Sequence, residues 1–379
     1  MISIAIIGAG IMAKKIAIRA RELNIKTLCF AWSKGADAKD SVDEFHDVDI
    51  FDTETIISIC KEKNVTGVIA TTELTIKIAS IVANELNLTT NPLEISANIT
   101  NKNWVRQKGK NFKYIKQPFY KHIKDITENI QIESYPVIVK PVSYGGKQGI
   151  TVVFSEKEFQ AALCYAKEAI GNRNSDGIII EQFLSAGQEY SVESLSFHGK
   201  HNIIQVTQKD SSGAPHCVEL GHHQPADLTK EMRSYVEQAI TDMLDCVGIQ
   251  NGPCHTEIKI IDGEIYLIEI NARPGGDCIT SPLTELSSGY KYLTGIILAA
   301  CDIFLDPKTN SSSPKHAGIY LISKQTAHLK PLFDNCDGKE WLYSKNYVSD
   351  ELQEITHNDV MNLNNLIYYA NKKIGLEDI

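Results

Sequence analysis

The first ninety residues alternate short apolar runs with helix-like segments, and this alternation constrains the fold more than any other feature of the sequence. Strands are predicted at Ser3–Ile7, Thr27–Ala31 and Val65–Ala70, and helices at Met12–Leu23, Thr53–Lys63 and Thr75–Leu86. Strands that alternate with helices of this length are typical of a parallel sheet with helices on its faces. We therefore expect an α/β, Rossmann-like domain over residues 1–95.

A different pattern begins near Ser96, where antiparallel strand pairs join the helices. The clearest hairpin is predicted around Asp262-Gly263, a dipeptide that favours the tight turn between two paired strands, with strands at His255–Ile260 and Glu264–Ile270. Mixed helices and antiparallel strands predict an α+β central domain over residues 96–310. A small mixed C-terminal domain is expected over residues 311–379.

Composition excludes several classes of protein. The 38 basic and 47 acidic side chains give a formal net charge of −9, so we expect neither a nucleic acid nor an anionic membrane surface as a partner. The nine cysteines include no C-x-x-C pair, which favours reduced thiols. The apolar N-terminal run is shorter than a signal peptide requires, and a cytoplasmic location is expected.

A glycine-rich turn follows the first predicted strand at Gly8-Ala9-Gly10 and fits the G-x-G-x-x-A pattern with Ala13. Such glycines let the backbone turn tightly into a helix that can face a phosphate. A dinucleotide site also needs an acid at the end of the second strand, and Phe30–Ser33 contains none. The turn therefore favours a Rossmann-like domain without NAD over an NAD-dependent oxidoreductase.

A second glycine-rich segment, PVIVKPVSYGGKQG at 136–149, follows another apolar strand. The strand ends at Lys140, and the loop offers hydroxyl, ammonium and N–H groups that could surround a triphosphate. Its candidate ATP-binding residues are Ser143, Gly145, Gly146, Lys147 and Gly149. A glycine-rich hairpin with a solvated lysine is the structural alternative.

The segment IIIEQFLSAGQEYSVE at 178–193 places two acids after an apolar strand. Glu181 and the backbone of Phe183 and Leu184 could read an adenine ring, and Glu189 could accept a ribose hydroxyl. Considered alone, the segment fits two surface acids around a turn better.

The sharpest pattern is HTE at 255–257 followed by EINARPGGD at 269–277. Glu257 and Glu269 lie on the two strands of the predicted hairpin. Glu269 and Asn271 share one face of their strand, as does Arg273 if the strand runs that far. Carboxylate and amide oxygens suit Mg²⁺ held jointly with phosphates, and an arginine suits a phosphate or carboxylate. We favour a metal–phosphate site over a polar surface strand.

A last cluster is ELGHHQP at 219–225. Its paired histidines suggest zinc, but no third and fourth ligand follows at a familiar spacing. Adjacent histidines on a strand point to opposite faces, so one imidazole beside a substrate phosphate or carboxylate is the preferred interpretation.

In this order, the segments resemble the ATP-grasp superfamily of carboxylate–amine ligases from about Ile4 to Ala300. The resemblance implies a lid subdomain at about 115–185, with ATP, Mg²⁺ (or Mn²⁺) and a homodimer. It implies that Lys102 and Lys140 contact the ATP phosphates, that 143–149 is a lid loop, and that Glu181 and Leu184 contact adenine and Glu189 the ribose. It also implies that Glu257, Glu269 and Asn271 are metal ligands and that Arg273 and Gly276 have catalytic roles.

Within the superfamily, the chain is most similar to bacterial L-amino acid ligases. The resemblance implies that Glu219 binds a substrate ammonium, that His222 meets the transferred phosphoryl group, and that Arg273 contacts substrate. The expected reaction joins amino acids through an acyl phosphate and releases ADP and phosphate. The alternatives are a purine-biosynthesis-type enzyme that formylates or carboxylates a nucleotide amine, an NAD-dependent oxidoreductase, and a catalytically inactive nucleotide-binding regulator.

Overall fold

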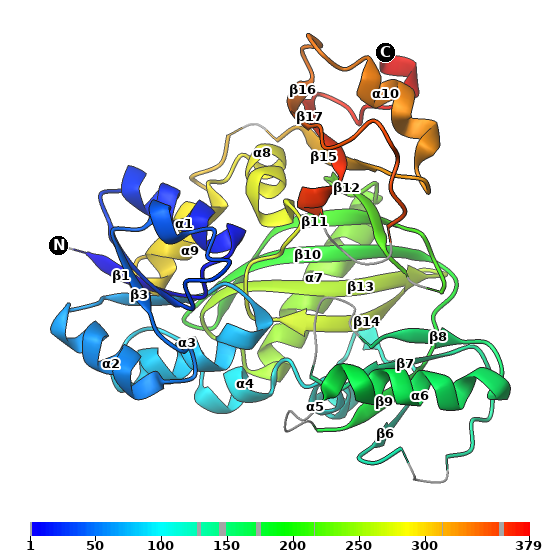
Figure 1. Cartoon of the computed structure of the whole chain (residues 1–379), viewed down its shortest axis with the longest axis horizontal. Coiled ribbons are helices and arrows are strands. Elements are labelled where there is room, and N and C mark those ends of the chain that lie inside the picture. The colour runs from blue at the N-terminus through cyan, green and yellow to red at the C-terminus, as the bar shows by residue number, and fades with distance from the viewer. Residues whose placement is uncertain are drawn as a thin grey trace.

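The computed structural model describes residues 2–126, 130–143, 149–171, 176–215, 217–312, 314–355 and 360–379. Figure 1 shows an N-terminal region in blue, a long central sheet in green and yellow, a smaller sheet covered by α6, and a C-terminal region in orange and red. Within these ranges, no helix is long and apolar enough to cross a membrane.

The N-terminal region is a parallel sheet with strand order β3-β2-β1-β4. Its elements are β1 (Ser3–Ile7), α1 (Ile11–Glu22), β2 (Lys26–Ala31), β3 (Glu44–Asp47), α2 (Thr53–Glu62), β4 (Gly67–Ala70), α3 (Glu73–Glu85) and α4 (Leu93–Asn98). The predicted strands and helices are confirmed. The sequence reasoning missed β3, a half-buried edge strand whose residues form no apolar run.

Burial explains why this region folds as it does. Every residue of β1 is buried, as expected for a parallel strand covered on both faces. Helix α1 turns Ala13, Ile16 and Ala20 inward, at the spacing of one helix face. Gly8, with φ of +92°, makes the predicted tight turn, and a Cβ there would lie only 2.6 Å from Thr71 Oγ1.

The central sheet has strand order β16-β17-β15-β12-β11-β10-β13-β14-β5. Its strands are β5 (Ile115–Lys116), β10 (Gln188–Phe197), β11 (Lys200–Ser211), β12 (Glu219–Gln224), β13 (Gly252–Ile261), β14 (Glu264–Asn271), β15 (His316–Ile322), β16 (Leu342–Asn346) and β17 (Asn364–Ala370). The predicted β13–β14 hairpin is confirmed, with Asp262 and Gly263 both at positive φ. Helix α7 (Lys230–Val247) packs its apolar face on this sheet (Figure 1).

A smaller antiparallel sheet with strand order β6-β9-β7-β8 forms the predicted lid region. Its elements are β6 (Tyr120–Ile123), β7 (Val137–Pro141), β8 (Thr151–Val153), α6 (Glu156–Ile170) and β9 (Ile178–Gln182). Helix α6 covers one face of this sheet (Figure 1), and the two share an apolar core. Helix α5 (Lys102–Lys108) precedes the lid sheet along the chain.

Two connections cross the predicted domain limits. After α8 (Glu285–Ser288), helix α9 (Tyr292–Ala300) packs its side chains into the core of the N-terminal sheet, although the chain has not yet reached residue 310. Beyond residue 311, β15 pairs with β12, so the C-terminal region extends the central sheet. Its remaining helix, α10 (Lys330–Asp334), packs beside β15 and β17.

Candidate active site

A cavity of about 860 Å³ lies between the lid sheet and the central sheet. The loop after β4 closes one end of it with Thr71, Thr72 and Glu73. The predicted site residues that line this cavity are Lys102, Lys140, Glu181, Phe183, Leu184, Glu189, Glu219, Glu257, Glu269, Arg273 and Gly276. Segments more than 150 residues apart therefore meet at one site.

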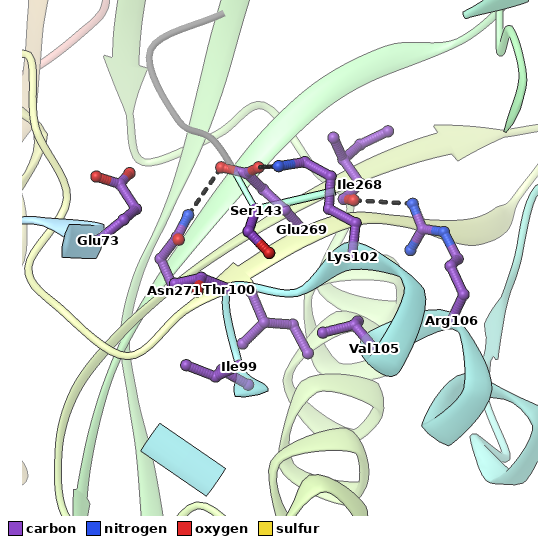
Figure 2. Close-up of a pocket in the computed structure, with 11 residues that line it drawn as sticks. Glu73, Ile99, Thr100, Lys102, Val105, Arg106, Ser143, Ile268, Glu269 and Asn271 are labelled. Carbon is purple, nitrogen blue, oxygen red and sulfur yellow. Dashed lines mark hydrogen bonds and ion pairs between the residues drawn. The ribbon is translucent and has the colours of Figure 1, made fainter. Parts of the chain in front are cut away.

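The predicted metal ligands lie together on the β13–β14 hairpin. Glu257 and Glu269 are direct cross-strand partners, and Asn271 follows two residues along the same strand. Figure 2 shows the Glu269 carboxylate between the Asn271 amide, which donates to Oε1 at 2.8 Å, and the Lys102 ammonium, 3.7 Å from Oε2. Because its nitrogen faces Glu269, the amide leaves its carbonyl oxygen available to a cation. This oxygen-rich set suits Mg²⁺.

Lys209 on β11 is a buried cation that the sequence reasoning missed. Its Nζ lies 2.5 Å from Glu257, 2.8 Å from Glu219 and 3.6 Å from Glu189. Burial lowers the pKa of Lys209, but these carboxylates outweigh burial and raise it well above its usual value. For Glu257, burial raises the pKa of the carboxyl group, but Lys209 and His255 outweigh burial, so the pKa lies below its usual value. Glu257 is therefore ionised, as a metal ligand must be.

A second buried cluster joins α5 to the lid sheet. Arg106 grips Glu181 with both ends of its guanidinium, at 2.6 and 3.3 Å, and Lys140 Nζ lies 2.5 Å from the same carboxylate. Burial lowers the pKa of Lys140; Glu181 opposes that shift, and the neighbouring Arg106 and Lys102 cations add to it. Two cations share one carboxylate here, so the cluster keeps a positive charge that suits a phosphate.

The Arg106–Glu181 contact predicts an acid-dependent stability. Burial raises the pKa of Glu181, but Arg106 and Lys140 more than offset this and lower it to about 2. A carboxyl group whose pKa is depressed on folding stabilises the protein above its unfolded pKa of 4.5, and this contribution is lost as the pH falls from 4.5 towards 2. From that pKa difference, the Glu181 contribution is on the order of 3 kcal/mol.

The measurement is urea unfolding of the wild type and of Glu181→Gln at several pH values between 5 and 3. We expect the free energy of unfolding to fall less steeply in the variant, because glutamine has no carboxyl group to protonate. Glu264→Gln, at an exposed pair with Lys116, is the control and should retain the wild-type slope. Equal slopes in Glu181→Gln and wild type would contradict the assignment.

The segment after β9 provides an apolar slot rather than a free acid. Arg106 and Lys140 both pair with the Glu181 carboxylate, so it is not a free acid. Phe183 and Leu184 line the cavity together with Ile138 and Ile268. These side chains form an apolar surface of the kind that a planar base contacts. Sequence reasoning missed Arg106, although it lies four residues after Lys102 and therefore on the same face of α5.

The lid loop is described only at its two ends. Ser143 lies with Lys102 and Asn271 in a small pocket beside the main cavity, as Figure 2 shows. Gly149, with φ of +68°, packs so closely on α6 that a Cβ would lie 2.7 Å from Ala169 Cβ. The predicted residues Gly145, Gly146 and Lys147 lie outside the described residues.

Glu219 and Asp277 line the cavity and meet the buried His222, which does not line it, with ligand atoms all within 4.8 Å of one another. Glu219 and His222 are three residues apart but share a face, because β12 carries an extra residue where its register with β11 shifts. As predicted, His223 points the other way, towards Asp210 and Tyr368. The described structure thus supplies Asp277 as a third ligand atom, which sequence spacing did not reveal.

Burial shapes the charge of this cluster. The Glu219 Oε2 and His222 Nε2 atoms are 2.9 Å apart, and His222 is fully buried. Burial first, and then the Glu219 carboxylate, raise the pKa of Asp277. A cation placed among these groups would stabilise the ionised forms of Glu219 and Asp277, so the cluster can accept an ammonium group or a metal ion.

Arg273 lies two residues beyond the end of β14, so the strand ends before it could place Arg273 on the same face as Glu269 and Asn271. Its guanidinium donates to the carboxylate of Glu73, at the start of α3, and to the Pro274 carbonyl at 2.6 Å. Burial raises the pKa of Glu73, but Arg273 outweighs it and lowers the pKa. Gly276 faces open space in the cavity.

Residues 133–281 match the family model of the ATP-grasp domain. The L-amino acid ligase from Bacillus licheniformis superposes with a TM-score of 0.78 over 98% of this chain and 94% of that one, at 22% identity. The N5-carboxyaminoimidazole ribonucleotide synthetase from Thermotoga maritima superposes with a TM-score of 0.71, at 98% and 94% coverage and 17% identity.

Sequence relatives add a different emphasis. The formate-dependent phosphoribosylglycinamide formyltransferase of Methanocaldococcus jannaschii is 22% identical over 78% of this chain and 76% of that protein. The D-alanine–D-alanine ligase of Campylobacter concisus is 26% identical over 37% of this chain and 41% of that protein. The predicted ATP-grasp fold is confirmed, and the oxidoreductase alternative is set aside. For the substrates, the comparisons back the nucleotide-amine alternative better than the amino-acid prediction.

Proposed function

We propose that the protein joins a carboxylate to an amine in an ATP- and Mg²⁺-dependent reaction that passes through an acyl phosphate. The observation that carries this proposal is the convergence of Glu257, Glu269 and Asn271 with Lys102 and Lys140 around the main cavity and the small pocket beside it. Phosphoryl transfer needs charge neutralisation and alignment more than covalent help, and this set offers both. A bound Mg²⁺ would neutralise charge on the phosphates.

The bond changes balance without a side-chain nucleophile. A carboxylate oxygen of the substrate attacks the γ-phosphorus, an O–P bond forms, the bond to the β-phosphate oxygen breaks, and ADP leaves. The amine nitrogen then attacks the acyl carbon, the bond to phosphate breaks, and the amine loses a proton as phosphate departs. Arg273 and the backbone at Gly276, which both line the cavity, would stabilise the oxyanion formed in the second step.

Acidic side chains in the cavity support an amine that carries a positive charge. Glu219 and Asp277 both line the cavity and lie close together. Lys209 offsets part of the charge of Glu219 at 2.8 Å, and Arg273 is already engaged by Glu73. An acidic pocket attracts an ammonium group and repels a phosphate. These contacts favour an amino acid as the amine substrate.

Sequence similarity supports a second candidate pair, formate and phosphoribosylglycinamide. Several relatives that align with about three quarters of this chain are formate-dependent formyltransferases of that nucleotide. In that case the same metal and lysine groups would serve ATP, and the amine would be part of a phosphorylated substrate.

A screen with Mg·ATP tests both candidates. The wild type is incubated with all pairs of amino acids and, separately, with formate and phosphoribosylglycinamide, and ADP, AMP, phosphate and product mass are measured. We expect ADP and phosphate to be released with one class, together with a product one water lighter than the sum of its substrates. A product from amino acids selects the first candidate, and a formylated nucleotide selects the second. AMP as the nucleotide product would contradict the acyl-phosphate route.

A further inference from the structure

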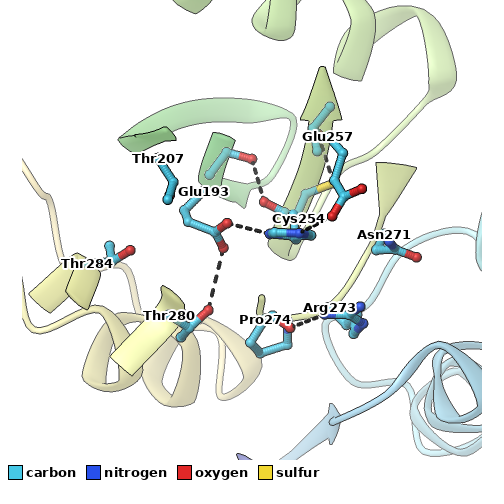
Figure 3. Close-up of polar contacts among 12 residues, drawn as sticks. Glu193, Thr207, Cys254, Glu257, Asn271, Arg273, Pro274, Thr280 and Thr284 are labelled. Carbon is cyan, nitrogen blue, oxygen red and sulfur yellow. Dashed lines mark hydrogen bonds and ion pairs between the residues drawn. The ribbon is translucent and has the colours of Figure 1, made fainter. Parts of the chain in front are cut away.

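Glu193 and His255 form a buried contact beneath the metal ligand Glu257. The two residues are direct cross-strand partners on β10 and β13, and His255 Nδ1 lies 2.5 Å from Glu193 Oε1. Glu193 is fully buried and His255 is only 4% exposed. Figure 3 shows Glu193 pointing towards this contact from one side, with Glu257 on the other. Neither residue has a role in the chemistry proposed above.

The other ring nitrogen of His255 reaches the metal ligand itself. His255 Nε2 lies 3.3 Å from Glu257 Oε1, and Lys209 Nζ donates to the same oxygen at 2.5 Å. Among the described residues, none donates to Glu257 Oε2. One carboxylate oxygen is therefore fixed by two neighbours while the other is left to face a cation, an arrangement that sets the orientation of the ligand.

The Glu193–His255 pair also lies against the loop that carries Arg273 and Gly276. A Cβ on Gly275 would lie 2.7 Å from His255 Nδ1 and 2.9 Å from Glu193 Oε2, so only glycine allows the loop to pack this closely. On its far side, Glu193 accepts a hydrogen bond from the Thr280 hydroxyl at 3.4 Å (Figure 3). The pair is thus held by the loop and by Thr280 in the position from which His255 contacts Glu257.

We propose that Glu193 and His255 are positioning residues that orient Glu257 for the metal–nucleotide complex. His255 contacts the ligand, and Glu193 fixes the orientation of the imidazole. The inference rests on the proposed metal role of Glu257. It adds a requirement for two residues beyond the proposed metal ligands Glu257, Glu269 and Asn271.

The test measures metal binding rather than turnover. Mn²⁺ affinity is determined by electron paramagnetic resonance in the presence of ADP for the wild type, His255→Asn and Glu193→Gln. Removing a residue that orients a metal ligand weakens metal binding about tenfold or more, and we expect this loss in both variants. Binding of a fluorescent ADP analogue without metal should stay within about twofold of the wild type, since neither residue belongs to the nucleotide slot.

Asp245→Asn is the matched control, because Asp245 contacts His201 at 3.1 Å outside the cavity. It should leave Mn²⁺ affinity unchanged. Wild-type Mn²⁺ affinity in both test variants would overturn the inference, and so would an equal loss of metal-free ADP binding. If either variant fails to fold, Thr280→Val replaces it, and an unchanged Mn²⁺ affinity there overturns the inference. Failure of the wild type to bind Mn²⁺ with ADP would instead contradict the proposed function.

Discussion

Glu269→Ala is expected to reduce turnover by about a thousandfold, because a lost metal contact removes several kcal/mol of transition-state stabilisation and each 1.4 kcal/mol is about tenfold in rate. The carboxylate lies opposite Glu257 and is held by Asn271 and Lys102, so alanine removes a ligand together with its contacts to these two residues. Phosphate release is measured at saturating Mg·ATP with the substrate pair that the screen identifies.

Glu264→Ala provides the matched control on the same strand. Glu264 lies at the other end of β14, half exposed and paired with Lys116. We expect it to keep wild-type turnover within about twofold, because exposed ion pairs contribute little. Full activity of Glu269→Ala would rule out the metal assignment. A loss in both variants would point to damage to the hairpin instead.

Arg106→Ala is expected to lower the free energy of unfolding by about 3 kcal/mol. Removing one partner of a buried ion pair costs about 3–5 kcal/mol, because it leaves an uncompensated charge. The lower end applies here, since Lys140 still contacts Glu181 after the change. Arg106 is only 1% exposed and also donates to the Ile268 carbonyl at 2.9 Å, so alanine leaves that acceptor buried as well. Urea unfolding at pH 7 measures the difference.

Arg233→Ala is the control for this comparison. Arg233 pairs with Glu237 one turn further along α7, and both side chains are partly exposed. Because Arg233 also donates to Gln205 Oε1 at 2.9 Å, its loss should cost about 1 kcal/mol, well below the cost of Arg106→Ala. Arg106→Lys should fall between wild type and Arg106→Ala, because lysine keeps the charge but lacks the planar fork that grips Glu181 at two points. Equal stability of Arg106→Ala and wild type would contradict this account of the cluster.

Local pattern was enough to predict much of the fold. Strands β1 and β2 are apolar along their length because both faces of the sheet are covered. Helix α1 has apolar residues at the spacing of one face because only that face is buried. The β13–β14 hairpin follows from the need for positive φ at Asp262 and Gly263. By contrast, β3 is an edge strand whose order comes from pairing with β2, and its own residues give little local signal.

The site was harder to predict where charge is neutralised at long range. Arg106 meets Glu181 across 75 residues and Lys209 meets Glu257 across 48, so neither pairing leaves a local pattern. No local pattern gave Glu193 a role, since its contact with His255 depends on the register of β10 against β13. The roles taken from the family resemblance for Glu219 and His222 remain proposals.

The central sheet continues beyond β12 into β15, so the C-terminal region is hydrogen-bonded to the strand that carries Glu219 and His222. A chain shortened before β15 would leave the hydrogen-bonding edge of β12 open, on the strand that carries Glu219 and His222. Open strand edges pair with other chains. The C-terminal region therefore covers the edge of the strand on which the amine is proposed to bind. Substitutions in this region can affect catalysis by shifting β12.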